Sequence, residues 1–129
     1  MIGNIAQNWV LLVDDEPDNT STLKKGLEAH GFSVKVYNDP VRAIADYKPK
    51  QYDFHVLDIR MPGINGIGFA RQIWQLSPDA QVCFLSAFEI YEEEARKVFM
   101  NLNTRCFVKK PISTSELAKH LQSHVMAMP

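Results

Sequence analysis

The chain has 129 residues, and its 14 Lys and Arg side chains nearly balance its 15 Asp and Glu side chains, giving a formal net charge of −1. This length predicts one domain over residues 1–129, with a core from about residue 9 to residue 127, since domains commonly hold roughly 100–200 residues. The balanced charge, the lack of a long apolar run and the lack of a signal peptide predict a cytoplasmic protein that binds neither nucleic acid nor membrane.

Five short apolar or β-rich runs predict β-strands. The first, third and fourth runs are almost continuously apolar, which is typical of strands buried on both faces of a sheet. In the second run Phe32, Val34 and Val36 alternate with more polar residues, and the fifth run turns polar at Lys109, so both are predicted to be edge strands. The runs are Trp9–Val13, Phe32–Tyr37, Phe54–Leu57, Val82–Leu85 and Cys106–Val108.

Five helical patterns fill the gaps between and after these runs. Gly31 would end the first helix, and Asp39-Pro40 would begin the second. Ser113 and Glu116 form a capping box at the start of the fifth, with Ile112 and Leu117 as its hydrophobic staple. The expected apolar stripes are Leu23 and Leu27; Val41, Ile44 and Ala45; Ile67, Ala70, Ile73 and Leu76; Ala95, Val98, Phe99 and Leu102; and Leu117, Leu121 and Val125. Strands alternating with helices predict an α/β fold in which helices cover both faces of a parallel sheet.

Polar side chains stand where four of the five predicted strands end. Asp14 and Asp15 follow the first strand, Asp58 follows the third, Ser86 follows the fourth, and Lys110 lies just past the fifth. The carboxyl ends of parallel strands share one edge of the sheet, so these groups should converge there. Clustered carboxylates repel one another unless a cation joins them, and hard carboxylate oxygens suit Mg²⁺. A lysine and a hydroxyl opposite the acids would hold the oxygens of a phosphate.

These strand-end motifs resemble the receiver domain of two-component response regulators. The resemblance spans about residues 9–127 and implies a flavodoxin-like, doubly wound sheet of five parallel strands in the order 2-1-3-4-5, flanked by five helices. The motifs, in chain order, are Val13-Asp14-Asp15-Glu16-Pro17, Leu57-Asp58-Ile59-Arg60-Met61-Pro62-Gly63, Asn65-Gly66, Ser86-Ala87 and Lys110-Pro111.

The resemblance implies a phosphoacceptor and a metal site. Asp58 would be the phosphorylation site, a carboxylate nucleophile that becomes an aspartyl phosphate. Asp14, Asp15, Asp58 and the main-chain carbonyl of Arg60 would be the Mg²⁺ ligands. No additional base is required, because Asp58 is expected to be ionised at neutral pH.

The resemblance also implies the remaining catalytic and switch residues. With Asp58, the catalytic set would contain Ser86 and Lys110, and the Lys110–Pro111 bond would be cis, aiming the lysine into the site. Ser86 would follow the phosphoryl group, and Phe107 would move with it as the aromatic switch.

The resemblance further implies a signalling function. A sensor histidine kinase would phosphorylate Asp58, and the surface of the fourth helix, fifth strand and fifth helix would change for an output protein that the sequence does not identify. The chain is expected to be a stand-alone receiver, working as a monomer or as a weak dimer that forms on phosphorylation. A phosphate relay or a phosphate sink stays open as an alternative. It would catalyse only its own phosphorylation and dephosphorylation, so it is not expected to be a turnover enzyme.

Three alternatives belong to other functional classes. A pseudo-receiver would act as a protein-interaction module without phosphorylation, but Asp14, Asp15 and Asp58 are all present. A phosphatase on this kind of fold would need an acid two residues past the nucleophile, where this chain has Arg60. A flavin carrier would need a Ser/Thr/Gly-rich loop after the first strand, where this chain has Asp-Asp-Glu-Pro.

Two further side-chain types have ordinary interpretations. Cys83 and Cys106 are predicted to be buried free thiols on neighbouring strands, since a cytoplasmic setting disfavours a bridge. His55, inside the third strand, is predicted to be a packed side chain and not a metal ligand.

Overall fold

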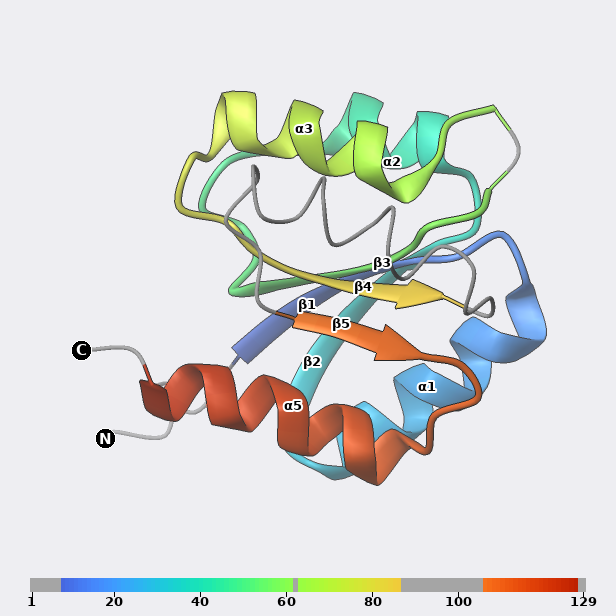
Figure 1. Ribbon diagram of the computed structural model, residues 1–129, viewed down its shortest axis with the longest axis vertical. Helices are drawn as coiled ribbons and strands as arrows, with labels where there is room; N and C mark the ends of the chain where they lie inside the picture. The colour runs from blue at the N-terminus through green and yellow to red at the C-terminus, as the bar shows by residue number, and fades with distance from the viewer. Residues whose placement is uncertain (1–7, 62, 87–105, 128–129) are drawn as a thin grey trace.

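Five parallel strands form one sheet in the order β2-β1-β3-β4-β5 (Figure 1). The computed structural model describes residues 8–61, 63–86 and 106–127, and in the last range the side chains of residues 108–123. The predicted order is confirmed, and so is the placement of β2 and β5 at the two edges. The strands are β1 (Asn8–Val13), β2 (Phe32–Tyr37), β3 (Phe54–Asp58), β4 (Gln81–Ser86) and β5 (Cys106–Lys109).

Helices cover both faces of the sheet, as Figure 1 shows. Helices α1 (Pro17–Ala29) and α5 (Thr114–Ala127) lie on one face, and α2 (Pro40–Asp46) and α3 (Gly66–Leu76) lie on the other. Four helices therefore flank the sheet within the described residues, instead of the five predicted. The predicted fourth helix, with Ala95 to Leu102, lies outside those residues.

Alternation along the strands divides the apolar residues between two cores. Val10 and Leu12 of β1 face the core shared with α1 and α5, whereas Leu11 and Val13 face the core shared with α2 and α3. Because successive side chains of a strand point to opposite faces, the continuous apolar runs of the central strands fill both layers at once. This explains why the predicted strand limits agree with the structure to within one residue.

Side-chain caps begin three of the helices. The Asp39 carboxylate accepts a hydrogen bond from the backbone N–H of Val41 (3.0 Å), and the Asn65 side chain accepts one from Gly68 (2.8 Å). At α5 the Ser113 hydroxyl accepts one from the N–H of Glu116 (3.1 Å), which is the serine half of the predicted capping box.

Two predicted apolar stripes are partly wrong. In α2, Val41 is 64% exposed and Ala45 is also exposed, whereas Ala43 is buried. In α3, Leu76 is 53% exposed, and Phe69, which the prediction omitted, is fully buried. A seven-residue helix such as α2 covers the sheet with a narrow stripe, so four-residue spacing alone does not fix which side chains face inward.

The prediction of free thiols is wrong for Cys83, which is disulfide-bonded. Cys106, the only other cysteine in the chain, is its direct partner in the β4–β5 register. Paired positions on neighbouring strands lie ~4.8 Å apart, a separation that a disulfide can span. A cytoplasmic setting disfavours a bridge, but the direct pairing of these two positions on β4 and β5 favours one.

None of the described helices has both the length and the apolar character needed to cross a membrane.

Candidate functional site

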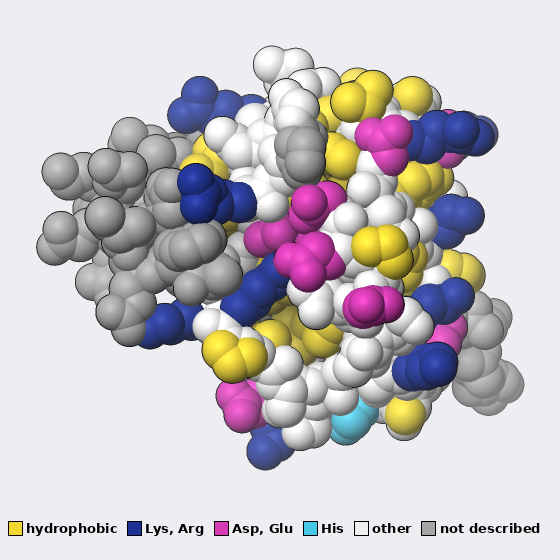
Figure 2. Space-filling model, turned by 90° about the vertical axis from the view of Figure 1, so that its right-hand side faces the viewer, with side chains coloured by type: hydrophobic (Ala, Val, Ile, Leu, Met, Phe, Trp, Pro, Cys, Tyr) yellow, Lys and Arg dark blue, Asp and Glu magenta, His cyan; other side chains and the backbone are white. Residues whose placement is uncertain are grey.

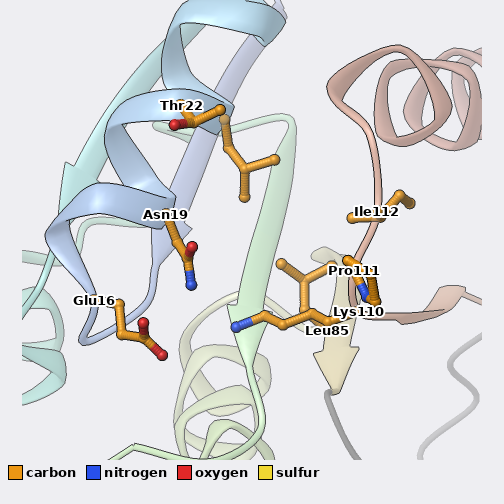
Figure 3. Close-up of a pocket in the computed structure, with 8 residues that line it drawn as sticks. Glu16, Asn19, Thr22, Leu85, Lys110, Pro111 and Ile112 are labelled. Carbon is orange, nitrogen blue, oxygen red and sulfur yellow. The ribbon is translucent and has the colours of Figure 1, made fainter.

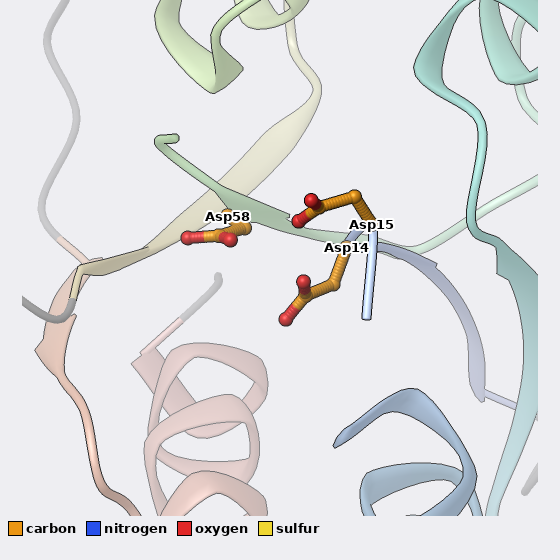
Figure 4. Close-up of side chains that lie close together, drawn as sticks. All are labelled: Asp14, Asp15 and Asp58. Atoms are coloured by element: carbon orange, nitrogen blue, oxygen red, sulfur yellow. The ribbon is translucent and has the colours of Figure 1, made fainter. Parts of the chain in front are cut away.

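Three carboxylates gather at the carboxyl-end edge of the sheet (Figure 4). Asp14 and Asp15 follow β1 directly, and Asp58 is the last residue of the neighbouring β3. One oxygen from each lies within 4.8 Å of the others. Asp14 is fully buried and Asp58 is 6% exposed, so water shields their charges only weakly. Seen from this edge, acidic side chains fill the centre of the surface beside basic ones (Figure 2).

Lys110 provides the cation opposite the acids. Its Nζ donates to Asp14 Oδ2 at 2.9 Å and lies 3.3 Å from Asp58 Oδ2. The lysine follows β5 directly, and the Lys110–Pro111 bond is cis. One lysine against three carboxylates leaves two negative charges without a matching cation when all four groups are ionised. Hard oxygens with this excess charge are suited to a divalent cation such as Mg²⁺.

The pKa values of Asp58 and Lys110 are both shifted by burial and by the neighbouring charges. Burial raises the pKa of Asp58 to about 6; the Asp14 charge adds to the rise, and Lys110 opposes it. For Lys110, burial alone would lower the pKa, but the carboxylates of Asp14 and Asp58 outweigh burial and raise it. At neutral pH Asp58 is therefore mainly ionised and Lys110 is charged, so a carboxylate and an ammonium face each other at this edge of the sheet.

Ser86 and Arg60 lie at the same edge of the sheet. Ser86 ends β4 and is 3% exposed, and its main-chain oxygen accepts a hydrogen bond from the N–H of Lys110 (2.6 Å). Arg60 follows Asp58 by two residues, and its side chain is exposed. Phe107, the predicted switch aromatic, is not among the residues whose side chains the structure describes.

The main chain around Asp58 is supported by the start of α3. The N–H of Gly66 donates to Ile59 O (2.8 Å), and the N–H of Ile59 donates to Leu85 O of β4 (3.0 Å). A Cβ on Gly66 would overlap the main-chain oxygen of Asp58, so only glycine allows α3 to begin this close to Asp58. The sequence identified Asn65-Gly66 as a motif but not this contact.

Asp14 is held by four neighbours. Its carboxylate accepts from the N–H of Glu16 (3.1 Å) as well as from Lys110, and its own N–H donates to Tyr37 O (3.2 Å). Its main-chain oxygen accepts from Asn38 Nδ2 (2.8 Å). Sequence reasoning missed Asn38; its only signal was a polar residue placed directly after β2.

A groove opens beside Lys110, between α1 and the segment that follows β5 (Figure 3). Its volume is about 470 Å³. Glu16 and Asn19 lie on the α1 side, and Pro111 and Ile112 lie on the opposite side. Lys110 thus borders both this groove and the acid cluster, whereas none of the three clustered carboxylates lines the groove.

Comparison with known proteins links this geometry to a family. The family model described as Response regulator receiver domain matches residues 10–122. The transcriptional regulatory protein TrcR of Mycobacterium tuberculosis is 32% identical over 113 residues, which cover 88% of this chain and 43% of that protein. The chain thus spans less than half the length of this curated relative.

Solved structures agree in fold. The non-phosphorylated HemR receiver domain of Leptospira biflexa is 29% identical, with a TM-score of 0.80 over 95% of this chain and 96% of that one. The response regulator TrrA of Thermotoga maritima, solved in complex with Mg²⁺-BeF, is 28% identical, with a TM-score of 0.76 over 90% of this chain and 97% of that one.

Proposed function

Because the chain belongs to the response regulator receiver domain family, we propose that residues 1–129 form one receiver domain that accepts a phosphoryl group on Asp58. The observation that carries this proposal is the position of the Asp58 carboxylate. Asp14 and Asp15 lie on one side of it, and the Lys110 ammonium lies 3.3 Å from its Oδ2. The intact cluster gives no support to a pseudo-receiver.

The proposed donor is the phosphohistidine of a sensor kinase. An oxygen of the Asp58 carboxylate attacks phosphorus, and the new O–P bond forms as the N–P bond to the imidazole breaks. The leaving imidazole keeps the electron pair and takes a proton from water. The kinase is regenerated in its neutral form, and Asp58 becomes an aspartyl phosphate.

Lys110 and Ser86 serve the transferred group in this proposal. The Lys110 ammonium already spans Asp14 and Asp58, so it needs only a small movement to reach a phosphoryl oxygen on Asp58. The buried Ser86 hydroxyl, at the end of the adjacent strand, is placed to follow that group. Phosphoryl transfer asks mainly for positioning and charge neutralisation, which these two side chains supply.

Asp14, Asp15, Asp58 and the carbonyl of Arg60 would hold Mg²⁺. When bound, the ion supplies positive charge that offsets both the acid cluster and the incoming phosphate. The fit rests on three carboxylate oxygens within 4.8 Å and on the uncompensated charge. The TrrA structure with Mg²⁺-BeF supports the same assignment for this chain.

We further propose that the domain works in the cytoplasm as a phosphorylation-dependent switch. Phosphate on Asp58 would draw in Ser86, Phe107 would follow, and the surface of the predicted fourth helix, β5 and α5 would change for an output protein. The proposed state is a monomer or a weak dimer that forms on phosphorylation. Its chemistry is limited to gaining and losing its own phosphate.

The test is phosphorylation by acetyl phosphate with Mg²⁺, read by intact mass. The wild-type protein should gain one phosphate, and Asp58→Ala should gain none. Asp79→Ala, which removes an exposed carboxylate outside the cluster, should behave as wild type. A phosphate that persists in Asp58→Ala would refute the assignment.

A further inference from the structure

We propose that Asn38 is a positioning residue for the acid cluster, because its side-chain amide extends the β1–β2 hydrogen-bond ladder past the end of β2 and fixes the main chain of Asp14. This inference rests on the proposed function, in which Asp14 helps to hold Mg²⁺. The Asn38 side chain bonds to the main-chain oxygen of Asp14 and not to its carboxylate. Asn38 therefore acts on the cluster through the backbone of Asp14.

The ladder shows where a hydrogen bond is required. Strands β1 and β2 pair in parallel up to Val13 and Tyr37, and the N–H of Asp14 still donates to Tyr37 O (3.2 Å). In a regular parallel ladder, the oxygen of Asp14 would next accept from the backbone N–H of Asp39. That oxygen accepts from Asn38 Nδ2 at 2.8 Å. The side chain thus provides the bond that the strand would provide if it continued.

The same nitrogen makes a second hydrogen bond. Asn38 Nδ2 donates to Thr20 Oγ1 (2.9 Å), and this hydroxyl donates to Pro17 O (3.0 Å). Thr20 is 2% exposed and lies in the first turns of α1. An amide nitrogen carries two protons, so both bonds can form at once. One side chain therefore joins the end of β1, the beginning of α1 and the loop after β2.

The position requires a neutral donor. Alanine at position 38 would leave the Asp14 oxygen without this bond and would free the loop after β1. Aspartate would place a charged acceptor against two groups that need a donor, and would add charge beside an already negative cluster. The side chain of Asp14 can meet both Glu16 N–H and Lys110 only if its main chain stays in place.

The experiment measures Mg²⁺ affinity by titration calorimetry, and unfolding without metal, in wild type, Asn38→Ala and Ser113→Ala. Loss of a partner that orients a metal ligand commonly lowers affinity by about 10–100-fold. Asn38→Ala should bind Mg²⁺ roughly tenfold more weakly than wild type. Ser113→Ala is the control, since it removes an uncharged side-chain hydrogen bond at the start of another helix, the bond from Glu116 N–H, away from Asp14. It should lose stability but keep wild-type affinity.

Hydrogen exchange of the metal-free protein separates this inference from the proposed function. The amides of Asp14 and Glu16 should exchange faster in Asn38→Ala than in the wild-type protein. In Ser113→Ala their exchange rates should equal those of the wild-type protein. Equal exchange, or equal Mg²⁺ affinity of Asn38→Ala and wild type, would overturn the role of Asn38. Failure of the wild-type protein to bind Mg²⁺ would instead overturn the proposed function, and the exchange rates would still decide whether Asn38 positions Asp14.

Discussion

The two ends of the sheet both bury polar side chains, but the amino end keeps them neutral. There, His55 is 1% exposed; its Nδ1 lies 2.9 Å from Gln81 O and its Nε2 lies 3.0 Å from Tyr47 Oη. A carbonyl can only accept, so Nδ1 carries the proton and Nε2 accepts from the tyrosine. Tyr47 Oη also lies 3.2 Å from Ser77 Oγ. This network is satisfied without a charge or an ion.

The carboxyl end has the opposite character. Asp14 and Asp58 share the ammonium of Lys110, Asp15 lies beside these two carboxylates, and burial raises the pKa of Asp58 to about 6. At the amino end, burial lowers the pKa of His55 and so favours its neutral form. Burial of polar groups by itself therefore does not mark a functional site. Buried like charges mark such a site when the protein leaves them partly uncompensated, since an external ion or phosphate can then bind favourably.

The strongest test of this contrast removes the cation at the carboxyl end. Lys110→Met should slow phosphorylation of Asp58 by roughly 100-fold or more, because a preorganised donor to the transferred group is lost. Lys109→Met removes an adjacent, exposed lysine and should change the rate less than about threefold. Rates follow from intact mass against time with acetyl phosphate and Mg²⁺. Equal slowing in both variants would mean that Lys110 acts only through overall charge.

The corresponding change at the amino end should affect stability and not phosphorylation. His55→Leu leaves Gln81 O and the Tyr47 hydroxyl without their partner in a buried setting, so the free energy of unfolding should fall by about 2–4 kcal/mol. His30→Leu is the control, because His30 is exposed although it too contacts a carbonyl, that of Gly26 at 2.8 Å. It should cost less than about 1 kcal/mol. Urea unfolding measures both, and a slower phosphorylation rate in folded His55→Leu would contradict the separation.

Most of the fold could be predicted because strand burial has a direct sequence signal. Strands buried on both faces need continuous apolar residues, and this identified β1, β3 and β4. Helix faces were less certain: Ala43 is buried and Val41 is exposed, since a short helix can turn its stripe by one residue at little cost. The bond at Cys83 depends on strand register, which single-strand patterns do not contain.

The candidate site was predictable where a side chain ends a strand. Asp14, Asp58 and Lys110 could be placed together because parallel strands bring their carboxyl ends to one edge. Asn38 could not, since it acts on a main-chain oxygen from a neighbouring loop, and neither spacing nor residue type shows such a contact. Gly66 was noticed as a helix start, but its approach to the Asp58 main chain depends on tertiary packing.

A smaller effect is expected when one charge at the carboxyl end is removed. Because the pKa of Asp58 is about 6 in the fold and 3.8 ordinarily, ionising this group destabilises the folded state at neutral pH by at most about 3 kcal/mol. Asp58→Asn should therefore raise the metal-free free energy of unfolding by about 1–3 kcal/mol. Asp79→Asn, an exposed control, should leave it within about 0.5 kcal/mol. Denaturant unfolding in EDTA measures the gain, and a loss of stability in Asp58→Asn would show that the Lys110 contact dominates.

The finest test uses pH, because the two ends respond to acid with opposite signs. The raised pKa of Asp58 makes the folded state bind more protons than the unfolded state between 3.8 and about 6, so this group adds stability as pH falls through that range. The lowered pKa of His55 does the reverse: below 6.5 the unfolded state takes up a proton that the folded state resists, and stability falls until pH reaches the folded-state pKa. In the wild-type protein the two contributions partly cancel.

Single variants should separate the two contributions. Between about pH 4.5 and 7, stability of metal-free Asp58→Asn should fall more steeply with acid than that of wild type, because only the histidine contribution remains. Stability of His55→Gln should fall less steeply or rise. Each group can change the slope by at most about 1.4 kcal/mol per pH unit.

The double variant Asp58→Asn/His55→Gln supplies the baseline of all other titrating groups, against which urea unfolding at each pH is compared. If both single variants follow the slope of the double variant, neither group titrates abnormally. If they diverge to opposite sides of it, the two buried ends of the sheet differ in charge as described.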